Sequence, residues 1–165
     1  MEYTVRKGTL DDAPAIAEIF NHYIATSSVI FSERLRSADE MRDTLVPVVQ
    51  GDFPFYVAES DGKIIGYCYS HLWMPDAVYR YCWELTEYLS SEATGHGVGS
   101  HLLRRVMEEC RDKKAHTLVA FVTADNDACG RMLGRLGFSH IGTLRQTGRK
   151  FGAWYDDAIY QLIFE

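Results

Sequence analysis

The chain has 165 residues, of which 47% are hydrophobic and 24% are charged, and its formal net charge is -6. This composition is typical of one globular domain, and we interpret residues 1–165 as that domain. The negative balance argues against a nucleic-acid-binding protein, which usually carries a basic surface. No apolar run is long enough to cross a membrane, and residues 1–12 lack the apolar core of a signal peptide. We therefore expect a cytoplasmic protein without a membrane partner.

The four cysteines of the chain are widely spaced, and no CxxC pair occurs; they are Cys68, Cys82, Cys110 and Cys129. Most of them stand in apolar runs. Such spacing favours reduced, buried thiols over disulfides or a metal centre. We predict no metal site.

The first elements are a strand and a helix. Residues 3–7 alternate and predict a first strand. Either Asp11 or Asp12 can cap the helix that Pro14 opens. A second helix follows, because the sequence SADE over residues 37–40 is typical of a capping box. This second helix should end near residue 49.

The middle of the chain is rich in strand-forming residues. The sequence FYVAESDGKIIGYCYS over residues 55–70 predicts a hairpin that turns at Asp61-Gly62. A loop around Trp73 leads to a further strand over residues 81–89. A glycine-rich stretch and a strongly periodic helix come next.

Beyond this helix the chain alternates between strands and helices. We predict a strand over residues 115–123, a short helix over residues 126–136 and a last strand over residues 154–164, with room for one more strand over residues 139–144. The whole order is β-α-α-β-β-β-α-β-α-β, a mixed α/β fold. The unit of strand, glycine loop, helix and strand favours a parallel pair with a ligand site at the carboxyl end of its first strand.

The glycine-rich stretch is TGHGVGS, residues 94–100, and it opens directly into the helix. Glycines allow close backbone approach, and a helix N-terminus presents unpaired N–H groups, so the stretch can hold an anion such as a phosphate. The alternative is a tight loop that only starts the helix. The stretch has no lysine for a P-loop, and its glycine spacing does not fit a dinucleotide fold.

Taken together, these segments resemble the GNAT superfamily of N-acyltransferases, which use acyl-CoA. The resemblance rests on residues 89–103, on the NDAC…LGF segment over residues 126–138, and on the order of the strands. The family pattern [QR]xxGx[GA] falls on residues 94–99, with Thr94 in place of Gln or Arg. The resemblance implies a mostly antiparallel sheet with a central splayed parallel pair, and backbone amides that hold the coenzyme A pyrophosphate.

Three further segments resemble the phosphinothricin acetyltransferase branch of this family; they are NHYIATSSVIF (21–31), YRYCWE (79–84) and GRKFGAWYD (148–156). The branch implies an N-acetyltransferase for a small amino-acid-like amine such as phosphinothricin or methionine sulfoximine. It also implies a homodimer. For Lys150, Trp154 and Asp156, in the last segment, we expect a structural or dimer-interface role.

The resemblance also assigns residue roles. Glu84 takes the position of the branch's catalytic glutamate and is the candidate base. Glu87 stands three positions on and should face the other side of the sheet. A bulge in this strand should free backbone N–H groups for the thioester oxygen. The expected acetyl-CoA-binding residues are Glu87, Tyr88, Leu89, Thr94, Gly95, His96, Gly97, Val98, Gly99, Ser100 and Asn126.

The acceptor should lie near Glu84. Arg80 is the candidate cation for an amino-acid carboxylate, although a surface arginine would look the same, and the candidate walls are Phe31, Trp73, Tyr79 and Tyr81. Leu133 occupies the position of the family's usual tyrosine and cannot protonate the leaving thiolate. Two alternatives stay open: a transferase for another small amine or a protein terminus, and a CoA-binding sensor or scaffold without turnover.

Overall fold

The computed structural model describes residues 1–165, which build one seven-stranded sheet with the order β1-β2-β3-β4-β5-β7-β6. The strands are β1 (Thr4–Lys7), β2 (Phe55–Ser60), β3 (Lys63–Leu72), β4 (Cys82–Leu89), β5 (Thr117–Thr123), β6 (Ser139–Lys150) and β7 (Ala153–Ile163). All neighbouring strands are antiparallel except β4 and β5. The predicted fold class is confirmed.

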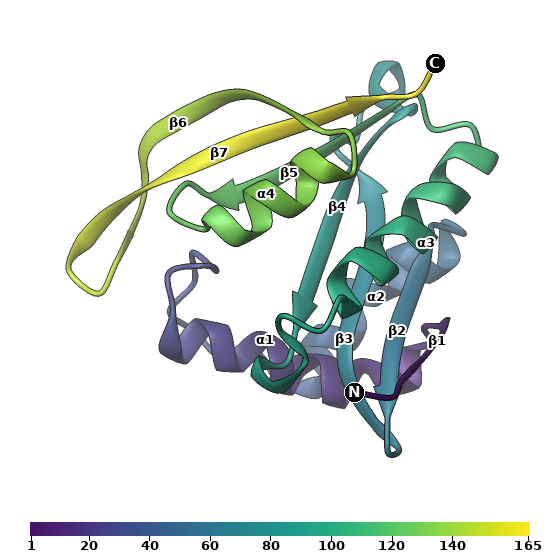
Figure 1. Ribbon diagram of the computed structural model, residues 1–165, viewed down its shortest axis with the longest axis vertical. Helices are drawn as coiled ribbons and strands as arrows, with labels where there is room; N and C mark the ends of the chain where they lie inside the picture. The colour runs from purple at the N-terminus through teal and green to yellow at the C-terminus, as the bar shows by residue number, and fades with distance from the viewer.

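Four helices cover the two faces of the sheet: α1 (Ala13–Thr26), α2 (Ala38–Gln50), α3 (Val98–Asp112) and α4 (Asp127–Arg135). The first two pack against one face, and α3 and α4 lie on the other (Figure 1). Three short 3-10 turns join the elements: η1 (Leu10–Asp12), η2 (Ala77–Tyr79) and η3 (Ser91–Ala93). None of the helices is long and apolar enough to cross a membrane.

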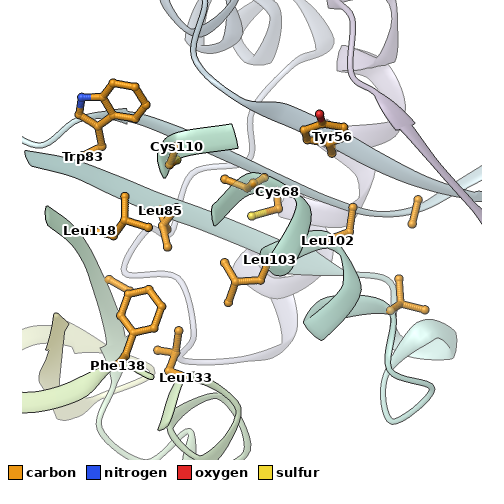
Figure 2. Close-up of a cluster of buried hydrophobic side chains, with 14 of the residues drawn as sticks. Tyr56, Cys68, Trp83, Leu85, Leu102, Leu103, Cys110, Leu118, Leu133 and Phe138 are labelled. Atoms are coloured by element: carbon orange, nitrogen blue, oxygen red, sulfur yellow. The ribbon is translucent and has the colours of Figure 1, made fainter. Parts of the chain in front are cut away.

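The larger core lies between α3 and the sheet. Leu102, Leu103 and Cys110 of α3 point toward Cys68 of β3 and Leu85 of β4, as Figure 2 shows. All five side chains are buried, and burying one such apolar side chain contributes roughly 1.5–3 kcal/mol. This packing fixes the N-terminus of α3 against the end of β4.

Local sequence signals set several element ends. The Ser37 hydroxyl accepts from the Glu40 N–H at 3.1 Å, and the Glu40 carboxylate accepts from the Ser37 N–H at 2.8 Å, which confirms the capping box. Asp61 and Gly62 both adopt positive φ in the predicted hairpin turn. Asp12 stands at the start of α1 but does not cap it with its side chain.

The Asp12 carboxylate has other partners. It accepts from the Thr9 N–H at 2.8 Å and forms a two-pronged ion pair with Arg6 at 2.8 and 3.0 Å. These contacts stabilise η1 and tie β1 to α1. Asp12, one of the two predicted candidates, therefore occupies the N-cap position of α1, but its carboxylate bonds to Thr9 and Arg6 instead of the first N–H groups of the helix.

The sheet splits between β4 and β5. These strands pair only from Cys82–Thr117 to Glu84–Val119, and beyond this point they diverge (Figure 1). β4 stays paired with β3 to its end, and β5 stays paired with β7 along its full length. The two half-sheets therefore separate beyond Glu84 and Val119 and leave a wedge-shaped opening.

The predicted bulge in β4 is wrong. Its register against β3 runs without a shift from Leu72–Trp83 to Gly66–Leu89. The irregularity lies one strand away, where β2 and β3 change register between Ala58 and Glu59. The splay thus arises because β4 stays paired with β3 while β5 stays paired with β7, and not because β4 contains an extra residue.

The last hairpin is longer than expected. β6 extends to Lys150, although the sequence predicted a strand only to Leu144. A register shift between Leu144 and Gly148, with positive φ at Gln146, interrupts its alternation. Because this irregular stretch breaks the alternation of inward and outward side chains, the second half of β6 could not be predicted from a period of two residues.

Candidate active site

The glycine stretch closes into a loop at the N-terminus of α3. Gly95 and Gly97 have φ of +81° and +79°, a conformation that side chains rarely adopt, and Gly97 is the N-cap residue. No side chain caps the helix there. The first N–H groups of α3 are therefore available to an anion.

A cavity of about 410 Å³ lies under this loop. Its walls include nine of the eleven residues expected to bind acetyl-CoA: Glu87, Tyr88, Leu89, Thr94, Gly95, Gly97, Gly99, Ser100 and Asn126. The other two are elsewhere. The Val98 side chain is fully buried in the core, and the exposed His96 is not part of the cavity wall. Arg135 of α4 also lines the cavity, and the sequence did not point to it because it lies 35 residues beyond the end of the glycine stretch.

A second cavity, of about 270 Å³, fills the opening between β4 and β5. Glu84, Phe31, Leu133 and Asp157 are among the residues of its wall. We call it the splay cleft. It shares six wall residues with the cavity under the glycine loop: Val29, Glu87, Tyr88, Asn126, Cys129 and Met132. The two cavities therefore meet, and an extended ligand can run from the glycine loop into the splay cleft.

Glu84 is positioned by the β3–β4 ladder. It lies directly opposite His71 of β3 and beside Val119 of β5, at the last paired position before the splay. Burial raises the pKa of this carboxyl, and the nearby His71 opposes that effect. A partly desolvated carboxylate at a cleft wall suits a general base. His71 could not be predicted as a neighbour of Glu84, because only strand register brings the two side chains together.

Glu87 faces the opposite side of the sheet from Glu84, as predicted. It lies opposite the buried Cys68, and one carboxylate oxygen is 3.4 Å from the place where a Cβ on Gly99 would lie. Its Oε1 is buried and has no hydrogen-bond partner. Burial raises the pKa of Glu87 to about 8, so the side chain is mostly protonated at neutral pH.

This carboxyl should make the protein less stable as pH rises. The folded state holds a proton on Glu87 up to about pH 8, whereas the unfolded chain releases it near pH 4.5. The unfolding free energy should therefore fall between these values by up to several kcal/mol, at about 1.4 kcal/mol per unit. The variant Glu87→Gln should lack this decline. Urea unfolding at pH 5 and pH 8 measures it, and parallel profiles for both proteins would contradict the assignment.

Tyr88 and Asn126 complete the shared wall. Tyr88 packs against Phe20 and Tyr23 of α1, with ring centroids 5.7 and 5.6 Å away. The Asn126 side chain accepts from the Cys129 N–H at 3.2 Å and so caps α4. The Thr94 hydroxyl donates to the Ser91 carbonyl at 2.8 Å and is engaged within the loop.

The expected acceptor residues separate into two groups. Phe31 lines the splay cleft, whereas Trp73, Tyr79, Arg80 and Tyr81 do not. Trp73 packs on Tyr79 at 5.3 Å, and Arg80 stacks over Tyr81 at 4.6 Å. The prediction that these four residues wall the acceptor site is therefore wrong. They are close to Glu84 in the chain, but the turn η2 just before β4 directs them away from the splay cleft.

The Arg80 side chain is held by this turn. Its guanidinium donates to the Ala77 carbonyl at 2.9 Å, and the Trp83 indole N–H donates to the Arg80 carbonyl at 2.9 Å. The splay cleft therefore has three acidic side chains, Glu84, Glu87 and Asp157, and no lysine or arginine in its wall. Glu87 is mostly protonated at neutral pH, so the negative charge that favours an amine over an anion comes from Glu84 and Asp157.

Lys150 holds one segment of the cleft wall in place through hydrogen bonds to backbone carbonyls. Its ammonium is buried, with 1% of the residue exposed, and donates to the Ser27 and Ile30 carbonyls at 2.7 and 2.9 Å. A longer contact of 3.5 Å reaches the Tyr23 carbonyl in the last turn of α1. Lys150 thus fixes the segment that carries Phe31, the structural role expected for it.

Comparison with known proteins agrees with this architecture. The Acetyltransferase (GNAT) family profile matches residues 16–138. The phosphinothricin N-acetyltransferase of Alcaligenes faecalis is 35% identical over 159 residues, which cover 96% of this chain and 81% of that protein. The L-methionine sulfoximine/L-methionine sulfone acetyltransferase of Salmonella typhimurium is 32% identical, over 96% of this chain and 93% of that protein.

A solved structure shares the fold closely. The crystal structure of a GNAT superfamily phosphinothricin acetyltransferase from Sinorhizobium meliloti, in complex with AcCoA, superposes with a TM-score of 0.95 at 28% identity. The match covers 99% of this chain and 89% of that one. The glycine loop, the splayed strands and the matched profile agree, and the chain belongs to the acetyltransferase (GNAT) family.

Proposed function

We propose that this chain transfers the acetyl group of acetyl-CoA to the amine of a small amino-acid-like acceptor of the phosphinothricin or methionine sulfoximine type. The main support for this proposal is that two cavities meet at the splay: one lies under the glycine loop, and the other has Glu84 in its wall. The names of the relatives support the acceptor class. Residues 1–165 act as one N-acetyltransferase domain, since a single sheet contains strands from both ends of the chain.

The cavity under the glycine loop fits acetyl-CoA. The free N–H groups of α3 would hold its pyrophosphate, with Arg135 beside them, and the wall shared with the splay cleft would line its pantetheine arm. Bound there, acetyl-CoA supplies the activated acetyl thioester. Asn126, engaged as a helix cap, contributes to this wall.

Glu84 would act as the base. A free amine is protonated at neutral pH and must lose a proton before its nitrogen can attack the thioester carbonyl. The Glu84 carboxylate can take that proton directly or through water. Phe31 would wall the acceptor side, and both substrates would be held together at the cleft.

The test is release of free thiol from acetyl-CoA with a panel of amines. The panel contains phosphinothricin, methionine sulfoximine, common amino acids and a polyamine. Strong release with one of the first two supports the proposal. Acetyl-CoA binding without release from any amine would instead indicate a sensor or scaffold.

A second candidate is an N-acetyltransferase for an amine that has no carboxylate. The acidic wall of the splay cleft favours this function, because no lysine or arginine of this chain lies there to pair with the carboxylate of an amino acid. Release with the polyamine alone would select this function. The base and the acetyl-CoA site would stay the same.

Gly97→Ala should weaken acetyl-CoA binding. A side chain at φ +79° costs about 1–2 kcal/mol, and although the new Cβ would meet no protein atom, Gly97 lines the cavity that would hold the anion. We expect the dissociation constant of acetyl-CoA, measured by calorimetry, to rise about tenfold, or ~1.4 kcal/mol.

Gly134→Ala is the matched control, because Gly134 lies within α4 and a Cβ there also meets no atom. It should leave the dissociation constant unchanged and raise stability by about 0.5–1 kcal/mol. Equal binding by the two variants would contradict the anion site.

We also propose a cytoplasmic homodimer. Four free thiols suit a reducing compartment. The β6–β7 hairpin extends beyond the rest of the domain (Figure 1), and it exposes Ile141, Phe151 and Trp154 at 54%, 60% and 57%. A second copy could cover this apolar strip. Light scattering in solution gives the mass that decides it.

A further inference from the structure

Glu87 is a buried carboxyl group that the proposed function leaves unused as a reacting group. Its Oε1 is enclosed and has no partner, although buried polar side chains are nearly always hydrogen-bonded. The side chain belongs to the wall of both cavities, at the place where they meet. The thioester sulfur must pass through this junction if the pyrophosphate is held at the glycine loop and the acetyl group near Glu84.

We propose that the carboxylic acid of Glu87 gives its proton to the thiolate of coenzyme A as that thiolate leaves. This inference rests on the proposed function. Glu84 first passes the proton of the ammonium to solvent, so that it is a carboxylate again when the neutral amine attacks. The amine nitrogen then forms its bond to the carbonyl carbon, and Glu84 takes the second proton that the nitrogen loses. The carbon–sulfur bond breaks with its electron pair on sulfur, and sulfur takes the proton of Glu87. Solvent in the cavities then returns a proton to Glu87 and removes one from Glu84.

The other protic groups at the junction suit this step less well. Burial raises the pKa of the Cys129 thiol to about 12 and that of the Tyr88 phenol above its ordinary value. Either group would have to give its proton to a thiolate whose conjugate acid has a pKa near 8.5, which is uphill. Leu133, which lies beside Phe138 in Figure 2 and shares the wall of the splay cleft with Cys129 and Tyr88, has no proton to give.

Glu87 is better matched to the thiolate. Its pKa, raised to about 8 by burial, lies close to that of a thiol, so the proton transfer is nearly balanced in free energy. The titratable groups that face it are Cys68 on β3, Cys129 on α4 and Tyr23 on α1. Burial raises the pKa of each above its ordinary value, so all three are neutral at pH 7 and none forces Glu87 to ionise.

The test compares Glu87→Gln with the wild-type protein. Glutamine keeps the volume and a donor group but cannot release a proton at this pH. We expect kcat/KM for the amine to fall about 100-fold, while the dissociation constant of acetyl-CoA stays at the wild-type value. The wild-type kcat/KM should contain a decline above about pH 8 that the variant lacks.

A spectroscopic measurement makes the result independent of turnover. The infrared difference spectrum between wild type and Glu87→Gln at pH 7 should show the carbonyl band of a protonated carboxylic acid. This band should vanish as the pH passes about 8. Ser90→Ala is the control, because the Ser90 hydroxyl is also buried without a partner but lines neither cavity.

The outcomes separate cleanly. A loss of acetyl-CoA affinity as large as the loss of rate would show that Glu87 binds the pantetheine arm, and the proposal would fail. Full activity in Glu87→Gln, or no carboxylic acid band, would overturn it as well. Absence of turnover in the wild-type protein with every amine would instead overturn the proposed function.

Discussion

Replacing Glu84 by glutamine should lower kcat/KM for the amine by 100-fold or more while acetyl-CoA binding stays unchanged. General-base catalysis contributes about 10²–10⁴-fold, and glutamine keeps the shape of the side chain without its basicity. Glu84 lines the splay cleft but not the cavity under the glycine loop, so the two effects should separate. Steady-state kinetics and calorimetry measure them.

The pH profile gives a second readout for Glu84. Burial raises the pKa of Glu84 above the ordinary value of a glutamate, so the carboxylate forms only as the pH rises past the ordinary range. The wild-type rate should therefore increase with pH through a limb above the ordinary glutamate range, and Glu84→Gln should lose this limb. The amine's own ionisation adds a limb at higher pH that both proteins share.

Glu108→Gln is the control for this prediction. Glu108 undergoes the same chemical change on the exposed side of α3, where it pairs with Arg105 at 3.2 Å. Surface ion pairs contribute at most about 1 kcal/mol, so its kinetics should match the wild type. If Glu84→Gln kept more than about half of the wild-type rate, another group or solvent would have to be the base.

The variant Lys150→Met should both destabilise the fold and raise KM for the amine. Methionine keeps most of the stem but removes an ammonium that donates to the Ser27 and Ile30 carbonyls. Hydrogen bonds to a charged group contribute about 1.5–3 kcal/mol, and the carbonyls left behind are enclosed. Relief of the ammonium's own desolvation offsets part of this loss, so we expect a net decrease of about 2 kcal/mol.

The kinetic effect follows from what Lys150 holds in place. The segment from Ser27 to Phe31 forms part of the cleft wall, and the Phe31 ring lies 6.1 Å from that of Tyr155 on the last hairpin. Without the ammonium this wall should loosen, which raises KM for the amine more than that for acetyl-CoA. Chemical denaturation and steady-state kinetics check both parts.

Lys7→Met provides the comparison for Lys150. Lys7 is also a lysine with a hydrogen-bond partner, but it lies on the surface, where it pairs with Glu109. Its loss should cost less than about 1 kcal/mol and leave KM unchanged. If the two variants were equally stable, the buried ammonium would not stabilise the fold.

Several features could be predicted from the sequence because they depend on neighbours in the chain. The capping box of Ser37 and Glu40, the hairpin turn at Asp61-Gly62 and the periodic face of α3 are all local patterns. The glycine loop is local as well, since its positive φ angles and the helix that follows are set within a few residues.

The alternation of β4 also follows from the chain alone. It places Glu84 and Glu87 on opposite faces of the sheet whatever surrounds them. The sequence therefore determined the mixed α/β class, the anion loop and the separation of the two carboxyl groups.

Tertiary structure decided the rest. His71 is brought beside Glu84 by strand register, and Arg135 is brought to the glycine loop by the packing of α4. The splay depends on which partner each of β4 and β5 keeps.

The roles of Glu87 and Arg80 depend on tertiary structure in the same way. Only the enclosure of Glu87 between β3, α3 and α4 raises its pKa, and only the turn before β4 holds Arg80 away from the cleft. Burial and long-range pairing depend on which distant segments pack together, so the raised pKa of Glu87 and the position of Arg80 could not be predicted from the sequence alone.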